Sequence, residues 1–282
     1  MVPVSLTRLA LLNSFIRRAF GQSLRLGPAI IALTTIPLVA DDARLAEQAG
    51  WEALLNLQNR EAVEYFAAST TRSSQLGEAL ALLNSQPQTR ANFGRAEQLL
   101  TALHESNPHD ESGIAATYYL GRLAQLNPFG PDYAKAARYL ENLIEQHPST
   151  PYAQMAITKL AILRIYLLPQ ESTREATLGE LNNRLSPYLA LPAAIRDFNL
   201  ILADAYARFQ ISDEAALNHL LAAYHSGVLI GKARSDILLR IGELSRLLGD
   251  KDQAKRFYRQ FLEEFPRDQR THTIRERLEA LS

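Results

Sequence analysis

The sequence predicts an all-α fold, a right-handed α-solenoid of about six helical hairpins that ends in a capping helix. Two observations predict it. Small residues recur at intervals of 34 to 40 residues, and the apolar residues between them follow the period of an α-helix. No stretch of the chain shows the sustained alternation of apolar and polar residues that is typical of a half-buried strand.

The repeat is clearest in the second helix of each unit, where an alanine stands near the start. The series is Ala62, Ala96, Ala136, Ala176, Ala215 and Ala254. Three of these alanines are followed twelve residues later by a proline, at Pro108, Pro148 and Pro266. Because proline lacks an N–H group and clashes with the preceding turn, each proline should end its helix and begin a linker.

Helical periodicity also marks the elements within the units. One stripe comprises Tyr133, Ala136, Ala137, Leu140, Leu143 and Ile144. We expect partner helices over Ala116–Leu126 and Ile237–Leu248. Residues 269–281 are rich in charge and are expected to form the capping helix, whose Ile274, Leu278 and Leu281 would cover the last hairpin.

These residues resemble the tetratricopeptide repeat family, whose pattern has Leu-Gly on helix A and Ala, a bulky residue and Pro on helix B. The third unit offers Leu120-Gly121, Ala136, Leu140 and Pro148, and the last unit offers Ile241-Gly242, Ala254, Tyr258 and Pro266. The resemblance covers about residues 42–267. Most intervals exceed the family's 34 residues, which leaves a Sel1-like or other α-solenoid subtype open.

The first forty residues differ from the rest of the chain. They contain four arginines and no acidic residue, and Leu26 to Ala40 carries no charge. A basic start, a short apolar stretch and a small residue before Asp41 are typical of a secretory signal peptide. The stretch is shorter than the ~20 apolar residues that span a bilayer as a helix, but an uncleaved anchor stays open. We therefore expect residues 1–40 to be a signal peptide or N-terminal membrane anchor, and residues 41–282 to form the repeat domain.

Composition and motifs exclude several classes of function. The chain has 30 basic and 30 acidic residues, so no overall positive field indicates nucleic acid. It has no Cys, which excludes disulfides, thiolate catalysis and a lipidated cysteine. No phosphate-binding, dinucleotide, nucleophile-elbow or HExxH motif is present. His104 and His109 are five residues apart with Pro108 between them, a poor spacing for metal ligands. The sequence predicts no catalytic residue, cofactor or metal.

The resemblance implies that a protein or peptide partner binds the concave face, which helix A lines in this family. By position, the partner-binding residues are Tyr118, Arg122, Gln125, Asp204, Arg208, Glu243 and Arg246. They do not reproduce the Lys/Asn cluster that clamps a C-terminal carboxylate in chaperone-binding members.

The leading hypothesis is a non-enzymatic protein-interaction scaffold of the bacterial cell envelope. It would be exported to the periplasm, or anchored in the inner membrane and facing the periplasm. One alternative is an envelope or outer-membrane assembly factor, or a chaperone-like factor, anchored by its N-terminal segment. Another is an enzyme accessory domain that resembles the helical ring of some transglycosylases.

Overall fold

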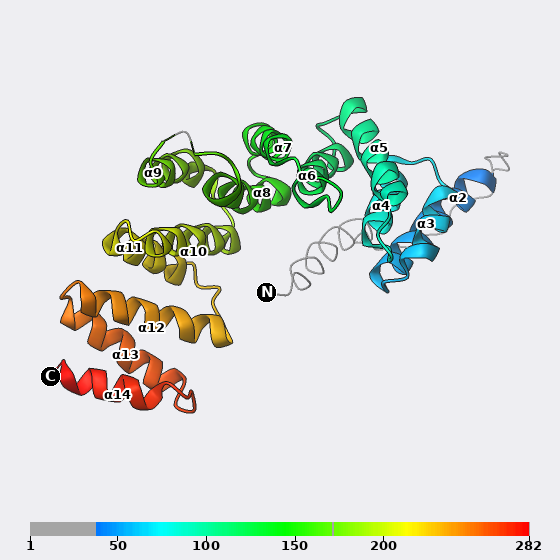
Figure 1. Cartoon of the computed structure of the whole chain (residues 1–282). Helices are drawn as coiled ribbons and strands as arrows, with labels where there is room; N and C mark the ends of the chain where they lie inside the picture. Colours follow the sequence, from blue (N-terminus) through cyan, green and yellow to red (C-terminus); the bar gives the residue numbers. More distant parts are fainter. Residues whose placement is uncertain (1–37, 171, 282) are drawn as a thin grey trace, which may run out of the picture. The chain divides into compact units, whose positions relative to one another are not determined.

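The computed structural model describes residues 38–170 and 172–281, and these residues contain 13 α-helices and no strand (Figure 1). The predicted all-α fold is thus confirmed. Residues 1–37, which carry most of the predicted export signal, lie outside the described residues. The chain divides into two compact units, unit 1 up to Leu120 and unit 2 from Gly121 onward, and each is described by itself.

The helices form six consecutive hairpins, each with a helix A and a helix B, and a final helix, as the α-solenoid prediction requires. The hairpins of the described residues are α2 (Leu38–Leu55) with α3 (Asn59–Ala67), α4 (Arg72–Asn84) with α5 (Arg90–Ser106), α6 (Glu111–Leu126) with α7 (Tyr133–Gln146), α8 (Pro151–Ile162) with α9 (Arg174–Leu185), α10 (Pro192–Arg208) with α11 (Asp213–His225), and α12 (Gly231–Leu247) with α13 (Lys251–Glu264), followed by α14 (Thr271–Ala280). Helices α6 and α12 begin five and six residues before the starts expected from the sequence.

Short polar side chains start most of these helices. An N-cap side chain accepts a hydrogen bond from the backbone N–H three residues on, which satisfies a donor that the helix itself leaves free. Asp132 does this for α7 at 2.8 Å and Asp250 for α13 at 2.9 Å. At the other end, α5, α7 and α13 each stop two residues before the expected proline. Local sequence therefore sets both ends of these helices.

Three of the hairpins close because a glycine on helix A faces a bulky residue on helix B. A Cβ atom at Gly242 would lie 2.6 Å from the Tyr258 ring, and one at Gly121 would lie 2.9 Å from Leu140. In unit 1 the fully buried Phe66 ring would meet a Cβ at Gly50 at 2.7 Å. Only glycine permits these helices to pack so closely, as the repeat pattern predicted.

Two repeats depart from the alanine series. Ala176 is exposed, and helix α9 is anchored instead by the buried Leu178 and Leu181. In α11 the fully buried alanine is Ala216, while Ala215 is half-buried. The prediction of a packed alanine is therefore wrong at Ala176 and displaced by one residue at Ala215. The fourth helix A also differs, since α8 continues into a π-helix at Leu163–Leu167.

Successive hairpins of unit 2 pack in chain order, and α8 also packs directly on α10. The last three helices, α12 to α14, lie side by side at the C-terminal end (orange to red in Figure 1). Ile274 and Leu281 of the last segment are buried in the core formed with α12 and α13, and Leu278 packs against it. The expected capping helix is confirmed, at Thr271–Ala280.

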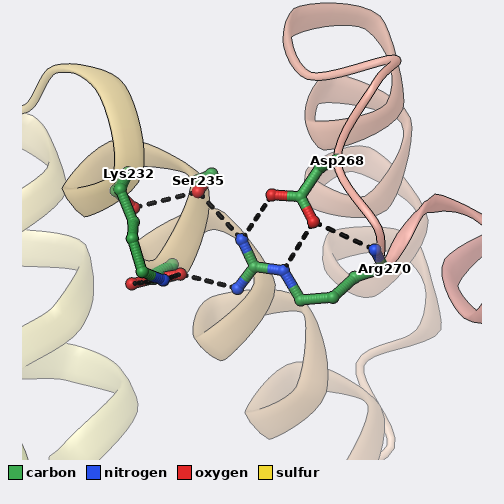
Figure 2. A network of polar contacts seen from close by, with 5 residues as sticks. Lys232, Ser235, Asp268 and Arg270 are labelled. Carbon is green, nitrogen blue, oxygen red and sulfur yellow. Dashed lines mark hydrogen bonds and ion pairs between the residues drawn. The ribbon is translucent and has the colours of Figure 1, made fainter.

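Polar contacts tie the cap to the hairpin before it. Figure 2 shows the guanidinium of Arg270 between Asp268 at 2.6 Å and Ser235 at 2.9 Å, and it also binds Asp236 at 2.6 Å. Hydrogen bonds from Arg270 lower the pKa of Asp268 to about 2. A comparable contact links α8 to the segment that leads into α10, where the Gln154 side chain accepts from the backbone N–H of Ala190 at 2.9 Å.

Candidate functional site

The helices A of unit 2 and the cap share a polar face, which we call the A face. It is the side of α8 with its π-helical extension, of α10, of α12 and of α14 that carries Lys159, Tyr166, Asp204, Arg208, Arg240, Glu243, Arg246 and Arg277. Residues three, four or seven apart share one side of a helix. For this reason α10 contributes both Asp204 and Arg208, and α12 contributes both Arg240 and Glu243.

Ion pairs cross this face from one helix A to the next. Arg240 of α12 binds Asp204 of α10 at 2.6 Å. Glu243 of α12 pairs with Arg277 of α14 and, at 3.2 Å, with Arg246 of its own helix. Ion pairs therefore join the A face across α10, α12 and α14.

The Glu243 carboxylate also accepts a hydrogen bond from the Tyr258 hydroxyl at 2.5 Å. Burial alone would raise the pKa of Glu243, but the hydrogen bonds from Tyr258, Arg246 and Arg277 lower it below its usual value. Burial, followed by the bond to Glu243, raises the pKa of Tyr258 to about 12. Glu243 is thus an anion that accepts hydrogen bonds from three donors of the chain.

Between these ion pairs the surface is hollowed. A cavity of about 660 Å³ is lined by Ala207, Asp236, Leu239, Arg240, Glu243, Leu244, Arg270, Thr273, Ile274 and Arg277. Its floor is mainly apolar, since Leu239 and Ile274 are buried and Leu244 is half-buried, whereas its rim carries the charged groups. The hollow suits an apolar side chain supplied by a partner.

An aromatic cluster lies where α8 and α10 end. The Tyr166 ring lies 5.8 Å from the Phe209 ring, and the guanidinium of Arg174 sits 3.9 Å above Phe209. Burial, together with the charge of Asp204, raises the pKa of the Tyr166 hydroxyl. Tyr166 and Leu167 are about 40% exposed. Exposed tyrosine and arginine are the residue types that contribute most to protein interfaces.

Upstream on the A face, Lys159 of α8 is half-buried. Burial lowers the pKa of its ammonium group, the nearby charge of Arg122 lowers it further, and Asp197 opposes the shift. Among the described residues Lys159 makes no hydrogen bond or ion pair. A half-buried ammonium group without an acceptor is a favourable place for an anion of a partner.

The structure brings together four of the seven residues that the sequence indicated. Asp204, Arg208, Glu243 and Arg246 all lie on the A face. Arg122, also in unit 2, is half-buried and binds the Gln125 side chain of its own helix.

Two of the seven are not accessible in this structure. Tyr118 is 7% exposed and Gln125 is 8% exposed. The expectation that these two side chains are exposed to a partner is therefore wrong. Both residues lie on α6, Tyr118 in unit 1 and Gln125 in unit 2.

Sequence reasoning missed several residues of this face. Arg240 lies three residues before Glu243, a helical spacing that could have placed it on the same side. Arg277 was missed because the last helix was treated only as a cover for the core. Lys159 and Tyr166 belong to the repeat whose sequence pattern is weakest.

No group of His, Asp and Glu that could hold a metal ion occurs within residues 38–170 and 172–281. No helix in the part of the chain that the structure describes is both long and apolar enough to cross a membrane.

Comparisons with known proteins agree with this architecture. The chain matches the tetratricopeptide repeat family over residues 115–150 and 236–268, which correspond to the third and sixth hairpins. None of the curated proteins is significantly similar in sequence.

Among solved structures, the chain is similar to one described as the functional characterization of Pseudomonas aeruginosa pilF. The identity is 13%, the match covers 85% of this chain and 99% of the other, and the TM-score is 0.52. A thermophilic TPR protein of Thermus thermophilus is 17% identical, with 75% of this chain and 98% of that chain covered and a TM-score of 0.40. The family match and the hairpin architecture lead to one conclusion: the chain carries tetratricopeptide repeats at residues 115–150 and 236–268, within an array of similar helical hairpins.

Proposed function

We propose that the chain is a non-enzymatic scaffold that binds a protein partner on the A face of unit 2. Tetratricopeptide repeat domains generally bind protein partners, and proteins of this family are typically non-enzymatic scaffolds. The observation that carries the proposal is the hollow of about 660 Å³, which lies on the side of helices A and combines an apolar floor with a charged rim.

The energetics favour a peptide or a protein segment as the guest. Burying one large apolar side chain in the hollow contributes about 1.5–3 kcal/mol. Charged groups on the rim, such as Arg240 and Arg277, then select the register in which the segment binds. Since Arg240 and Glu243 are already held by partners within the chain, little side-chain entropy is lost when the guest arrives.

We further propose that the scaffold works in the cell envelope, either in the periplasm or held at the inner membrane and facing it. The acid-free, arginine-containing start and the uncharged stretch from Leu26 to Ala40 support export. N-terminal sequencing of protein from fractionated cells tests this. A cleaved chain that starts at residue 41 in the periplasm, or an intact chain in the membrane fraction, supports it, whereas an intact chain in the cytoplasm contradicts it.

A steric block tests the binding face. Ala207 is an exposed residue on the lining of the hollow, and Ala207→Trp would fill the hollow without a change of charge. Ala176→Trp is the matched control, because Ala176 is an exposed alanine on a helix B of the same unit. The full-length protein and both variants are used to purify partners from envelope extract.

We expect Ala207→Trp to lose the main partner and Ala176→Trp to retain it. Equal recovery by Ala207→Trp and the unaltered protein would remove the A face from the proposal.

A further inference from the structure

The charges of the A face point to a specific chemistry of the partner. Together with the lining of the hollow and with Asp197, which lies seven residues before Asp204 on α10, the A face carries six cations, Lys159, Arg208, Arg240, Arg246, Arg270 and Arg277, and four anions, Asp197, Asp204, Asp236 and Glu243. By contrast, residues 41–282 as a whole have 26 basic and 30 acidic residues, because four of the 30 basic residues precede residue 41. The positive charge of this face is therefore local.

The anions of the face each pair with a cation of the chain itself. Asp204 is bound by Arg240, and Glu243 is bound by Arg246, Arg277 and the Tyr258 hydroxyl. Asp197 pairs with Arg196, and Asp236 pairs with Lys232 and Arg270. These internal pairs weaken the attraction of the carboxylates for basic groups of a partner. A basic partner would therefore meet uncompensated cations, which costs free energy.

Two cations, in contrast, have capacity to spare. Arg208 is exposed at the end of α10, and among the described residues it forms no ion pair. Lys159 is half-buried and, as described above, makes no hydrogen bond with any described residue. An acceptor delivered to either group adds a charge-assisted hydrogen bond that the free protein lacks.

The apolar component of the guest follows from the hollow beside Arg208. Ala207 lines the hollow and precedes Arg208 directly in α10, so the apolar floor adjoins the free guanidinium. A guest that satisfies both must carry a bulky apolar side chain with a carboxylate close to it in sequence.

We propose that the partner binds the A face through an acidic segment of its chain, in which Asp or Glu residues flank at least one bulky apolar residue. This inference rests on the proposed function and names the kind of partner. A nucleic acid fits less well, because Asp204 and Glu243 interrupt the cations and would repel a continuous phosphate backbone.

Charge reversal separates this inference from the proposed function. Arg208→Glu changes the charge of the A face at an exposed residue, and Arg259→Glu makes the same change at an exposed residue of α13, a helix B. We expect Arg208→Glu to weaken binding of the captured partner by about tenfold or more at low salt, with the deficit shrinking as salt is raised. Arg259→Glu should bind as the unaltered protein does.

Photo-cross-linking identifies the bound segment directly. The photoreactive residue p-benzoylphenylalanine is placed at position 247 of the full-length protein, and at position 259 as the control. Leu247 is 61% exposed, lies on the same side of α12 as Arg240 and Glu243, and does not line the hollow. The cross-linked peptide of the partner is then sequenced by mass spectrometry. An Asp- and Glu-rich peptide with an apolar residue, obtained from position 247 only, supports the inference.

The other outcomes are equally decisive. If Ala207→Trp blocks binding but Arg208→Glu does not, or if the cross-linked segment is neutral or basic, the inference is overturned while the proposed function stands. A cross-link to nucleic acid overturns it as well. If neither Ala207→Trp nor Arg208→Glu affects binding, both the inference and the proposed function fail.

Discussion

Replacement of Gly242 by alanine tests how the hairpins close. The added Cβ would lie 2.6 Å from Cε1 and 2.7 Å from Cδ1 of Tyr258, well inside ordinary contact distance. Tyr258 has no room to move, because it is fully buried and its hydroxyl is bound to Glu243. Overpacking of this kind lowers the unfolding free energy by about 1–3 kcal/mol. The exchange of glycine for alanine within a helix, by itself, raises it by up to about 1 kcal/mol.

Gly179→Ala is the matched control for this change. Gly179 also lies within a helix of unit 2, but a Cβ there would meet nothing within 4 Å. Gly179→Ala should therefore gain only the helix term, and the difference in unfolding free energy between the two variants isolates an overpacking cost of about 1–3 kcal/mol.

Thermal unfolding followed by circular dichroism measures this difference. For a domain of this size 1 kcal/mol corresponds to about 2–4 °C in Tm. We expect Gly242→Ala to melt below Gly179→Ala by roughly 2–12 °C, from the product of those two ranges. Equal increases in Tm for both variants would refute the close contact between Gly242 and Tyr258.

Three further predictions concern a turn, a histidine and the cap. Gln210 has a φ of 54° in the turn after α10, and Gly249 has a φ of 84° in the corresponding turn after α12. Gln210→Gly should raise the unfolding free energy by about 1 kcal/mol, and Gly249→Ala should lower it by about the same amount. Urea titrations measure both changes, and changes of the same sign would contradict the shared turn geometry. Burial lowers the pKa of His219 below 6.5 in the folded chain, so the unfolded chain binds the proton of this imidazole more readily. The unfolding free energy should therefore fall as pH drops through 6.5 and level off below the pKa of the folded state. His219→Gln should flatten that part of the pH profile, and an unchanged slope would contradict the assignment to His219. Arg270→Gln should speed amide hydrogen exchange in α14 far more than in α10, because the Arg270 side chain binds Asp236 and Ser235 of α12. An equal change of the exchange rate in both helices would show that the apolar contacts alone hold the cap.

Much of the fold could be predicted from the sequence, because the repeat depends on local signals. Pro108, Pro148 and Pro266 end their helices by a backbone effect that no distant contact overrides. Likewise the glycine at position 242 and the tyrosine at 258 are matched to each other by simple space filling.

The fourth repeat was predicted least well, for a physical reason. The packing of α9 depends on Leu178 and Leu181, which enter the core formed with neighbouring helices, and Ala176 faces solvent. The π-helix at Leu163–Leu167 adds a further shift in register that residue spacing along a regular helix does not reveal.

The partner-binding residues stay a prediction. Asp204 and Arg208, which the resemblance indicated by position, lie four residues apart on one helix and are both exposed. Gln125, which the resemblance indicated in the same way, is buried, because position in a repeat pattern does not determine how α6 packs. The Glu243–Arg277 pair joins residues 34 apart in sequence, so only the packing of α14 on the last hairpin reveals it.

Hydrogen–deuterium exchange of the full-length protein, measured with and without its captured partner, tests the central claim most directly. If the guest lies on the A face, amides should gain protection in α8, α10, α12 and α14. Protection confined to α9, α11 and α13, or the absence of any protection in a complex that is fully formed, would contradict it.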